Sequence, residues 1–263
     1  LFFLAFCISY NINASKCNHV DHNEIRYITN QKGLNVQYQE YLRNQFQWKE
    51  FLAIHGEWYT IFNEINQLPH RAFGEPILLD NVTNNHENIL VFLSDNNFIL
   101  PVDLRFSYKT TNDKHININF TQYFSELEVI NSRLYAKITH DDELIVFGLD
   151  VFNDINISTI PSISENNAIS SAAENITYPI TKSNVENELK ILPVPVNGKN
   201  EYHLVYTVYI NTRIDEGPAN YICYVDAHDG ELLMRKNKVL YEAPPVQPIV
   251  SVSGDVLTTN PNN

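Results

Sequence analysis

The feature that most constrains the fold of this sequence is a run of alternating apolar residues that begins near residue 115. In "HININF", three apolar side chains fall on one face of a strand: Ile116, Ile118 and Phe120. In "EVINSRLYAKI", the residues that share one face are Ile130, Ser132, Leu134, Ala136 and Ile138. The polar turn "THDDE" then leads into the apolar "LIVFGL". A period of two excludes a helix and predicts adjacent antiparallel strands.

A second block has one helical pattern followed by strands. Ser164 is a good N-cap, and Glu165 lies in the first turn of the predicted helix. The apolar stripe of this helix contains Ala168, Ile169, Ala172, Ala173 and Ile176. The apolar runs "ELKILPV", "YHLVYTVYI" and "NYICYVDAHDGELLMR" follow as strands, and Asp229-Gly230 marks a hairpin in the last of them. This pattern predicts a small α+β module.

The block before residue 115 mixes both periods. Three apolar residues recur at helical spacing: Trp48, Phe51 and Leu52. Residues 58–62 alternate as a strand does, and we expect a loop around Pro69 and Gly74 to follow. The apolar run "ILVFL", residues 89–93, predicts a further strand.

The 263 residues are enough for two modest modules. We predict the α+β class, with two consecutive modules over residues 48–155 and 156–241, each an antiparallel sheet packed with one or few helices. The apolar start "LFFLAFCISY" predicts a partial signal peptide over residues 1–14 and therefore a secreted protein, with a buried N-terminal strand as the alternative. We interpret residues 15–47 as a polar segment and the proline-rich residues 242–263 as a linker.

The charge balance restricts the partners. With 18 Lys and Arg against 31 Asp and Glu, the formal net charge is −13. Nucleic acid binding needs basic patches that replace the counterions of phosphates, so we expect no nucleic acid partner. An anionic membrane surface is disfavoured for the same reason, and we expect no stable membrane association after signal cleavage.

Residue types that could carry catalysis occur, but not in catalytic patterns. His86-Glu87 lacks the second histidine of a His-Glu-x-x-His motif. Cys223 lies in an alternating strand and predicts a buried structural thiol, which is paired with Cys17 or left apart. The stretch "CNHVDH" offers four residues of metal-ligand type, Cys17, His19, Asp21 and His22, at a spacing that matches no standard zinc site. We therefore predict no catalytic residue and no metal ligand in this chain.

Four segments with distinctive residues follow one another along the chain. The first two are "GEWYTIFNEINQLPHRAFGEPI" and "INFTQYFSELEVINSRLYAKITHDDELIVFGLDV", and the last two are "PSISENNAISSAAENI" and "LVYTVYI…NYICYVDAHDGELL". The motif residues are Trp58, Asn63, Pro69, His70, Arg71, Ala72 and Gly74, then Gln122, Tyr123, Val129 and Ser132, then Val225, Asp226, Ala227, Gly230 and Glu231. Together they resemble the propeptide of secreted zinc metallopeptidases of the fungalysin/thermolysin type, a propeptide domain followed by a PepSY module with cystatin/PepSY-like folds.

This resemblance implies a non-catalytic pro-region. In that family the propeptide helps the peptidase domain to fold and occupies its cleft until processing. The partner would be the cognate zinc metallopeptidase domain in cis, and the zinc cofactor would belong to that catalytic domain, which is absent from this chain. The full-length precursor would then be a zinc metalloendopeptidase. The chain departs from the family at Ser125-Glu126, where a glycine is common near the turn.

The resemblance also assigns roles to residues. Its structural residues are Trp58, Gln122, Ser132, Asp226 and Gly230. In "LPHRAFGEP" we interpret Arg71 as a clip to a carboxylate, with His70 in support and Gly74 in a tight turn; the alternative is that Arg71 only fixes this loop to its own sheet. The basic stretch "RKNK", with Arg235, Lys236 and Lys238, is the candidate processing region.

Two other functions compete with the pro-region. The first is a free-standing secreted protease inhibitor or binding module, complete as it stands. The second is a hydrolase or metal enzyme that uses Cys17, His19 and His22, which predicts stoichiometric zinc in the purified chain.

Overall fold

The described part of the chain folds into two antiparallel sheets with four helices packed against them, which confirms the predicted α+β class. The computed structural model describes residues 34–79, 85–98, 101–215 and 217–239. The first sheet has seven strands in the order β1-β2-β7-β6-β4-β3, and β5 pairs with β4. Its strands are β1 Trp58–Phe62, β2 Pro69–Leu78, β3 Asp103–Thr111, β4 Ile116–Phe124, β5 Leu127–Glu128, β6 Arg133–Ile138 and β7 Glu143–Asp150.

The second sheet has five strands and lies C-terminal to the first in the sequence. Its order is β12-β11-β10-β8, and β9 also pairs with β10. Its strands are β8 Ile180–Val185, β9 Lys190–Val196, β10 Lys199–Ile214, β11 Gly217–Asp226 and β12 Leu232–Asn237. The helices in the described ranges are α1 Val36–Arg43, α2 Phe46–His55, α3 Asn85–Asp95 and α4 Glu165–Ala173.

One side of the first sheet forms the core with the helices α1, α2 and α3. Cross-strand neighbours on this side form a continuous buried row: Thr60, Ala72, Phe147, Ala136 and Ile118. Phe51 of α2 contacts the rings of Trp58 and Phe147 edge to face, so α2 packs directly on the sheet. We call the seven-stranded sheet with α1, α2 and α3 the first unit, and the five-stranded sheet with α4 the second unit. This apolar burial is the main source of stability of the first unit.

The strand predicted over residues 89–93 is wrong, because these residues belong to α3. A strand would place Ile89, Val91 and Leu93 on the same face. Instead Ile89 and Leu93, four residues apart, are fully buried, and Val91 is 50% exposed. A short apolar run fits either period, and packing against the core selects the helical one here.

Helix α1 lies within the segment expected to be polar. Its Leu42 is buried in the core, and Gln39 pairs with strand β1 through its amide group. Gln39 Nε2 donates to the carbonyl of Phe62, and the Phe62 N–H donates to Gln39 Oε1, both at 2.9 Å. The side chain thus takes the place of a neighbouring strand and closes part of the free edge of β1.

The strand expected from residue 128 to 138 is interrupted. Leu134, Ala136 and Ile138 of β6 are buried on one face as predicted, whereas Ile130 leaves the first core. Asn131 has a φ of 63°, and Ile130 packs with Leu192 of the second unit. The turn at Ser125-Glu126 has positive φ at both residues, the left-handed conformation that glycine adopts most easily.

Helix α4 forms as the sequence predicts. The side chain of Ser164 accepts from the Asn167 N–H and caps the helix. Ala168 and Ala172 are fully buried against the second sheet. Their small size lets the helix approach strands β10 and β11 closely.

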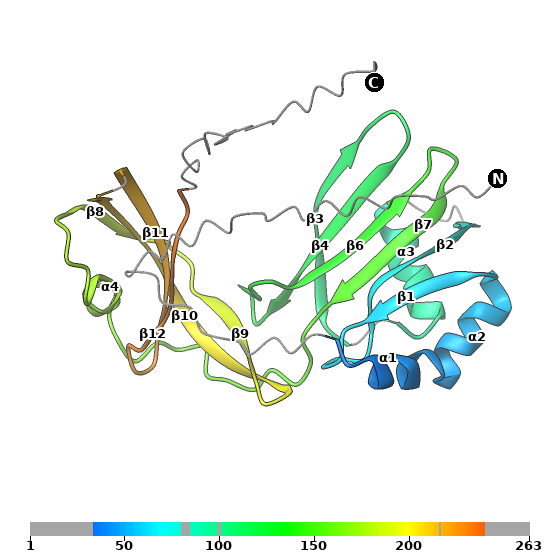
Figure 1. Ribbon diagram of the computed structural model, residues 1–263, viewed down its shortest axis with the longest axis horizontal. Helices are drawn as coiled ribbons and strands as arrows, with labels where there is room; N and C mark the ends of the chain where they lie inside the picture. Colours follow the sequence, from blue (N-terminus) through cyan, green and yellow to red (C-terminus); the bar gives the residue numbers. More distant parts are fainter. Residues whose placement is uncertain (1–33, 80–84, 99–100, 216, 240–263) are drawn as a thin grey trace, which may run out of the picture.

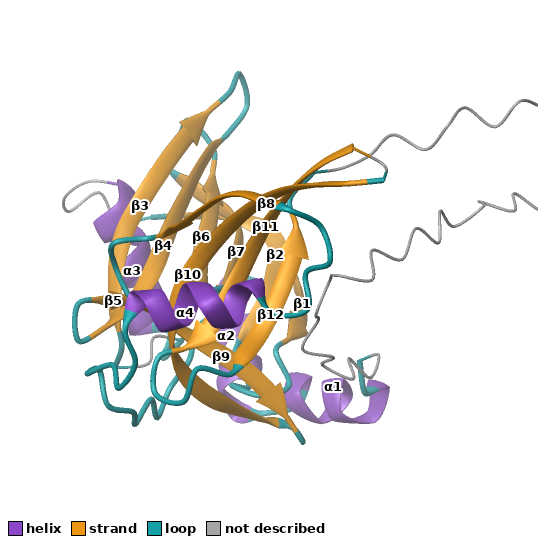
Figure 2. Ribbon diagram, turned by 90° about the vertical axis from the view of Figure 1, so that its left-hand side faces the viewer, coloured by secondary structure: helices purple, strands orange, loops and turns teal. Residues whose placement is uncertain are grey.

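Figure 1 shows α4 at one end of the molecule and α1 to α3 at the other, with both sheets between them. Figure 2, turned by 90°, shows the same arrangement from front to back, with α4 in front of the second sheet. The helix-free sides of the two sheets are therefore turned toward the middle of the molecule. A bridge between Val129 and Ile191 joins the two sheets. Among the described residues, no helix is long and apolar enough to cross a membrane.

Candidate functional site

The helix-free side of the first sheet, which we call the open face, carries large exposed side chains. It consists of Tyr59, Ile61, Arg71, Phe73, Tyr108, Asn117, Asn119, Arg133, Tyr135, Lys137, Val146, Gly148 and Asp150, which are neighbours across the strands. Tyr59 is 62% exposed and Phe73 is 46% exposed, and their rings stack with centroids 5.7 Å apart. Exposed aromatic side chains grouped in this way make this face a candidate binding surface.

The stretch "LPHRAFGEP" is part of this face and is not a loop. Residues 69–78 form strand β2, so the predicted tight turn at Gly74 is wrong. Gly74 is needed for another reason, because a Cβ there would lie 2.4 Å from the carbonyl oxygen of Glu57 and from the ring of Trp58. The ring of Trp58 occupies the space that a side chain at position 74 would fill.

His70 and Arg71 lie on this strand but have different contacts. His70 Nδ1 lies 2.7 Å from Asp150 Oδ1, so His70 fixes β2 to the end of β7. Arg71 is exposed, and its guanidinium lies 6.0 Å from the ring centroid of Phe73. Within the described ranges, no carboxylate forms an ion pair with Arg71. The expected clip to a carboxylate therefore does not form inside the described part of this chain.

A hollow of about 330 Å³ lies in the open face beside Arg71. Arg133 and Lys137 line its opposite side, with Tyr135 between them on strand β6. The guanidinium of Arg133 lies over the ring of Tyr135 at 4.2 Å, and burial raises the pKa of the Tyr135 hydroxyl. This hydroxyl donates to the carbonyl of His70 at 3.3 Å. The arrangement holds three cationic side chains around one polar depression.

Sequence reasoning missed most residues of this hollow. Arg133, Tyr135 and Lys137 alternate with the buried residues of β6, and Asn117 and Asn119 alternate with those of β4. The alternation that revealed the core therefore also marks these positions as one outward set. What the sequence did not show is that Arg71, more than sixty positions earlier, lies across from them.

Gln122 and Ser132 form one buried hydrogen-bond network. The Ser132 hydroxyl donates to the carbonyl of Val129 at 2.6 Å and accepts from the Gln122 N–H at 2.9 Å. Gln122 Nε2 donates to the carbonyl of Phe152 at 2.6 Å, and the Phe152 N–H donates to Gln122 Oε1 at 2.7 Å. The two residues thus hold the chain as it leaves the first sheet, beside the Val129 bridge to the second.

Lys190 strengthens the same junction. Its ammonium lies 3.1 Å from Glu128 of the first unit and 3.1 Å from Glu186 of the second. Burial opposes the charge of Lys190, but the hydrogen bonds to Glu186 and Glu128 outweigh it and raise the pKa of the ammonium group. The junction is therefore packed and hydrogen-bonded, which restrains the angle between the two sheets.

Asp226 and Gly230 organise the turn between β11 and β12. Asp226 is buried and accepts from the His228 N–H at 2.7 Å, and its Oδ2 lies 2.7 Å from His203 Nδ1. Gly230 has a φ of 83°, which explains the glycine, and its N–H donates to the Asp226 carbonyl. Five residues, 227–231, separate the two antiparallel strands, so the hairpin that Asp229-Gly230 indicated forms here.

The candidate processing region does not form an extended linker. Arg235 and Lys236 lie in strand β12, which pairs with β11. Arg235 is only 1% exposed, and its Nη1 donates to the carbonyls of Ala172 and Glu174 at 2.9 and 2.8 Å. A peptidase cannot reach a bond in a buried, paired strand. Of the three basic residues, only Lys238 lies beyond β12, so only Lys238 remains a candidate for the processing region.

Cys223 is a buried thiol, as predicted. It is fully buried in strand β11, and burial raises its pKa to about 12. The thiol therefore stays protonated and unreactive near neutral pH.

The ligand-type residues of "CNHVDH", Cys17, His19, Asp21 and His22, lie outside the described residues. In the described ranges, no three His, Cys, Asp or Glu side chains are close enough to share a metal ion.

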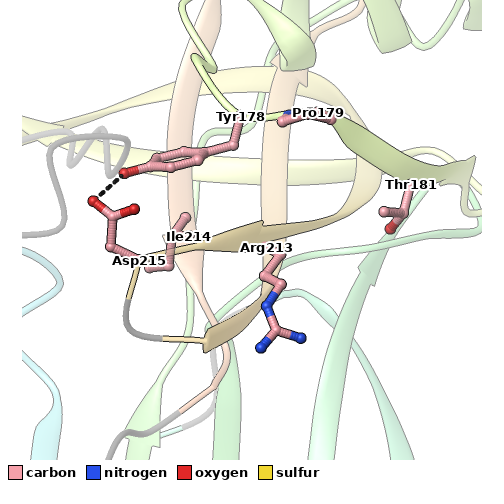
Figure 3. A pocket seen from close by; sticks show the side chains of 6 residues that line it. All are labelled: Tyr178, Pro179, Thr181, Arg213, Ile214 and Asp215. Atoms are coloured by element: carbon pink, nitrogen blue, oxygen red, sulfur yellow. Dashed lines mark hydrogen bonds between the residues drawn. The ribbon is translucent and has the colours of Figure 1, made fainter.

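A larger hollow, of about 480 Å³, lies at the turn end of the second sheet (Figure 3). The Tyr178 hydroxyl donates to Asp215 Oδ2 at 3.0 Å, and the Thr181 hydroxyl donates to the carbonyl of Asn211 at 3.0 Å. Figure 3 shows the guanidinium of Arg213 directed away from the Tyr178–Asp215 pair. None of the residues predicted from the sequence lies in this hollow, and its polar groups do not converge on a common point.

Comparison with known proteins reveals only distant likeness. No family model matches the chain, and no curated protein matches it. Among solved structures, the C-terminal domain of YpeB from Bacillus megaterium is similar over 78% of this chain and 98% of its own, with 12% identity and a TM-score of 0.32. A candidate lipoprotein from Clostridium difficile 630 is similar over 63% of this chain and 96% of its own, with 12% identity and a TM-score of 0.20. Likeness this distant carries no argument about function.

Proposed function

We propose that this chain is the non-catalytic pro-region of an exported zinc metallopeptidase of the fungalysin/thermolysin type. It would act as inhibitor and intramolecular chaperone of the peptidase domain until proteolytic processing. The observation that carries the proposal is the open face, a sheet side with exposed Tyr59, Phe73 and Tyr108 and three cationic side chains around a hollow. Exposed aromatic side chains beside charged ones support a role in binding a protein partner.

The order of the sequence motifs supports the same function. Gln122, Val129 and Ser132, which the family resemblance singles out, meet in one hydrogen-bond network. Asp226 and Gly230, singled out in the same way, build one turn of the second sheet. Motif residues that meet in space are easier to explain as a shared architecture than as chance matches.

The physics of a pro-region agrees with this architecture. A template that binds only the native peptidase domain stabilises that state by mass action and favours its folding. Tethering to the same chain raises the effective concentration, so a modest affinity is sufficient for inhibition. Cleavage of the tether then lets the pro-region dissociate.

The test is an inhibition and refolding assay with the whole chain. It would be titrated against a purified fungalysin- or thermolysin-type peptidase, preferably one encoded in the same reading frame. We expect stoichiometric inhibition that fades as the chain is digested, and a higher yield of active peptidase after refolding. A folded chain that neither binds its peptidase nor raises the refolding yield would overturn the proposal and favour a free-standing binding module.

A further inference from the structure

We propose that the open face binds an acidic segment on the surface of the peptidase domain, with a carboxylate seated in the hollow between Arg71 and the pair Arg133 and Lys137. This inference rests on the proposed function, since it names the chemistry that the partner presents to this face.

The charge of the hollow stands out against the rest of the chain. The formal net charge is −13, yet no ion pair in the described ranges involves Arg71, Arg133 or Lys137. Other exposed cations in these ranges, such as Lys182 and Lys199, also form no ion pair, so what distinguishes this site is that three cations gather around one hollow. The residues that line the hollow include these three cations and no Asp or Glu, and such a lining is complementary to an acidic group.

The shape of the hollow suits a carboxylate. Strand β7 separates β2 from β6, so Arg71 lies two strand spacings, about 10 Å, from Tyr135, and Arg133 and Lys137 lie two residues to either side of Tyr135 along β6. Between them the position on β7 is Gly148, which has no side chain, and the Tyr135 ring packs against it. An arginine fork on each side can donate two parallel hydrogen bonds to an acidic side chain of a segment laid across the face.

The apolar border supplies burial for the residues around that carboxylate. Tyr59, Ile61 and Phe73 lie beside Arg71 on strands β1 and β2 and are all exposed. Asp150 is the acid nearest to Arg133 on the adjacent strand, but its Oδ1 already accepts from Asn63 and contacts His70. The segment that fits therefore has acidic residues next to apolar or aromatic ones.

The experiment compares two charge reversals of equal size in the whole chain. Arg71→Glu with Arg133→Glu changes the open face. Lys182→Glu with Lys199→Glu changes two exposed cations of the second unit and serves as the matched control. Inhibition of the peptidase and direct binding are measured at low and high salt, and circular dichroism checks that each variant is folded. Should the reversal unfold the chain, Arg71→Gln with Arg133→Gln replaces it.

We expect the open-face variant to bind about 10- to 100-fold more weakly and to lose most of its salt dependence, and the control to change by less than about threefold. Equal affinity of both variants for the peptidase would overturn this inference and leave the proposed function intact.

Should the wild-type chain not bind the peptidase at all, an aspartate- and tyrosine-containing peptide becomes the probe. Its binding to wild type and not to the open-face variant supports the acidic ligand alone, whereas no binding overturns it. A wild-type dimer that the open-face variant dissociates would show that a second copy is the occupant, and the inference would be wrong.

Discussion

The open face of the first sheet and the contact between α4 and β12 in the second unit use arginine in opposite ways. Arg71 is exposed on the open face and forms no ion pair within the described residues. Arg235 is 1% exposed and donates to two carbonyls at the C-terminal end of α4, where the helix leaves carbonyls without partners. Arg71, which the sequence analysis assigned to a clip, is thus available to a partner. Arg235, which it assigned to the processing region, instead joins β12 to the end of α4.

The difference teaches that burial, and not residue type or the charge of its neighbours in sequence, decides what an arginine contributes. A buried guanidinium must satisfy its donors locally, since leaving one unsatisfied costs about 1–3 kcal/mol or more. An exposed guanidinium loses little in water, so it adds almost nothing to stability and remains free to bind.

The largest effect is expected for Arg235→Ala. The substitution removes a buried charge and leaves the carbonyls of Ala172 and Glu174 without their donor, so the free energy of unfolding should fall by about 3 kcal/mol. Lys236→Ala, on the exposed side of the same strand, should change it by less than about 0.5 kcal/mol. Urea denaturation of both variants is the measurement. Equal losses would remove the contrast between the two regions.

Gly148→Ala tests the one position of the open face where packing leaves no room. Its Cβ would lie 2.2 Å from the carbonyl oxygen of His70 and 2.4 Å from the ring of Tyr135. We expect a loss of about 2 kcal/mol, measured by thermal unfolding. Adding Tyr135→Ala should not restore stability, because the clash with the backbone of β2 stays. A fully stable Gly148→Ala variant would contradict the close approach of β2 and β7.

Cys223 tests the packing of the second unit through its pKa. Burial raises this pKa from an ordinary value of 9.0 to about 12, so in the folded protein the thiol should resist a thiol reagent at about pH 8. Above pH 9 the unfolded chain loses the proton and the folded chain keeps it, so this thiol lowers the stability progressively as the pH rises toward 12. Cys223→Ala should show the same native labelling, one thiol fewer after unfolding, and a weaker decline of stability at high pH. Rapid native labelling of Cys223 would mean that α4 does not cover β11.

The smallest effect on stability is expected for Arg71→Ala. The side chain is exposed and without an ion pair in the described ranges, so the free energy of unfolding should change by less than about 0.5 kcal/mol. Urea denaturation beside Arg235→Ala makes the comparison direct. A loss as large as that of Arg235→Ala would show that Arg71 holds its own sheet together, the alternative that the sequence left open.

Several parts of the fold could be read from local pattern because local physics decides them. Helix α4 follows from the Ser164 cap and its small apolar stripe, and strands β4, β6 and β7 follow from their alternation. Strand β2 and helix α3 could not be read in this way. The "PHRAFG" stretch looks like a turn until β1 and β7 pair with it, and the apolar run of α3 fits two periods.

By itself the sequence determined the class of the fold, the alternation that separates core from surface, the buried thiol at Cys223, and the motif residues that meet at the junction and the turn. Only the tertiary structure decided which arginine is buried and which cations share a hollow. Arg235 finds its acceptors 63 and 61 residues away in the sequence, and Arg71 lies opposite side chains of β6 across an intervening strand. Burial depends on which distant segments pack together, and that packing is a property of the whole chain that no local pattern contains.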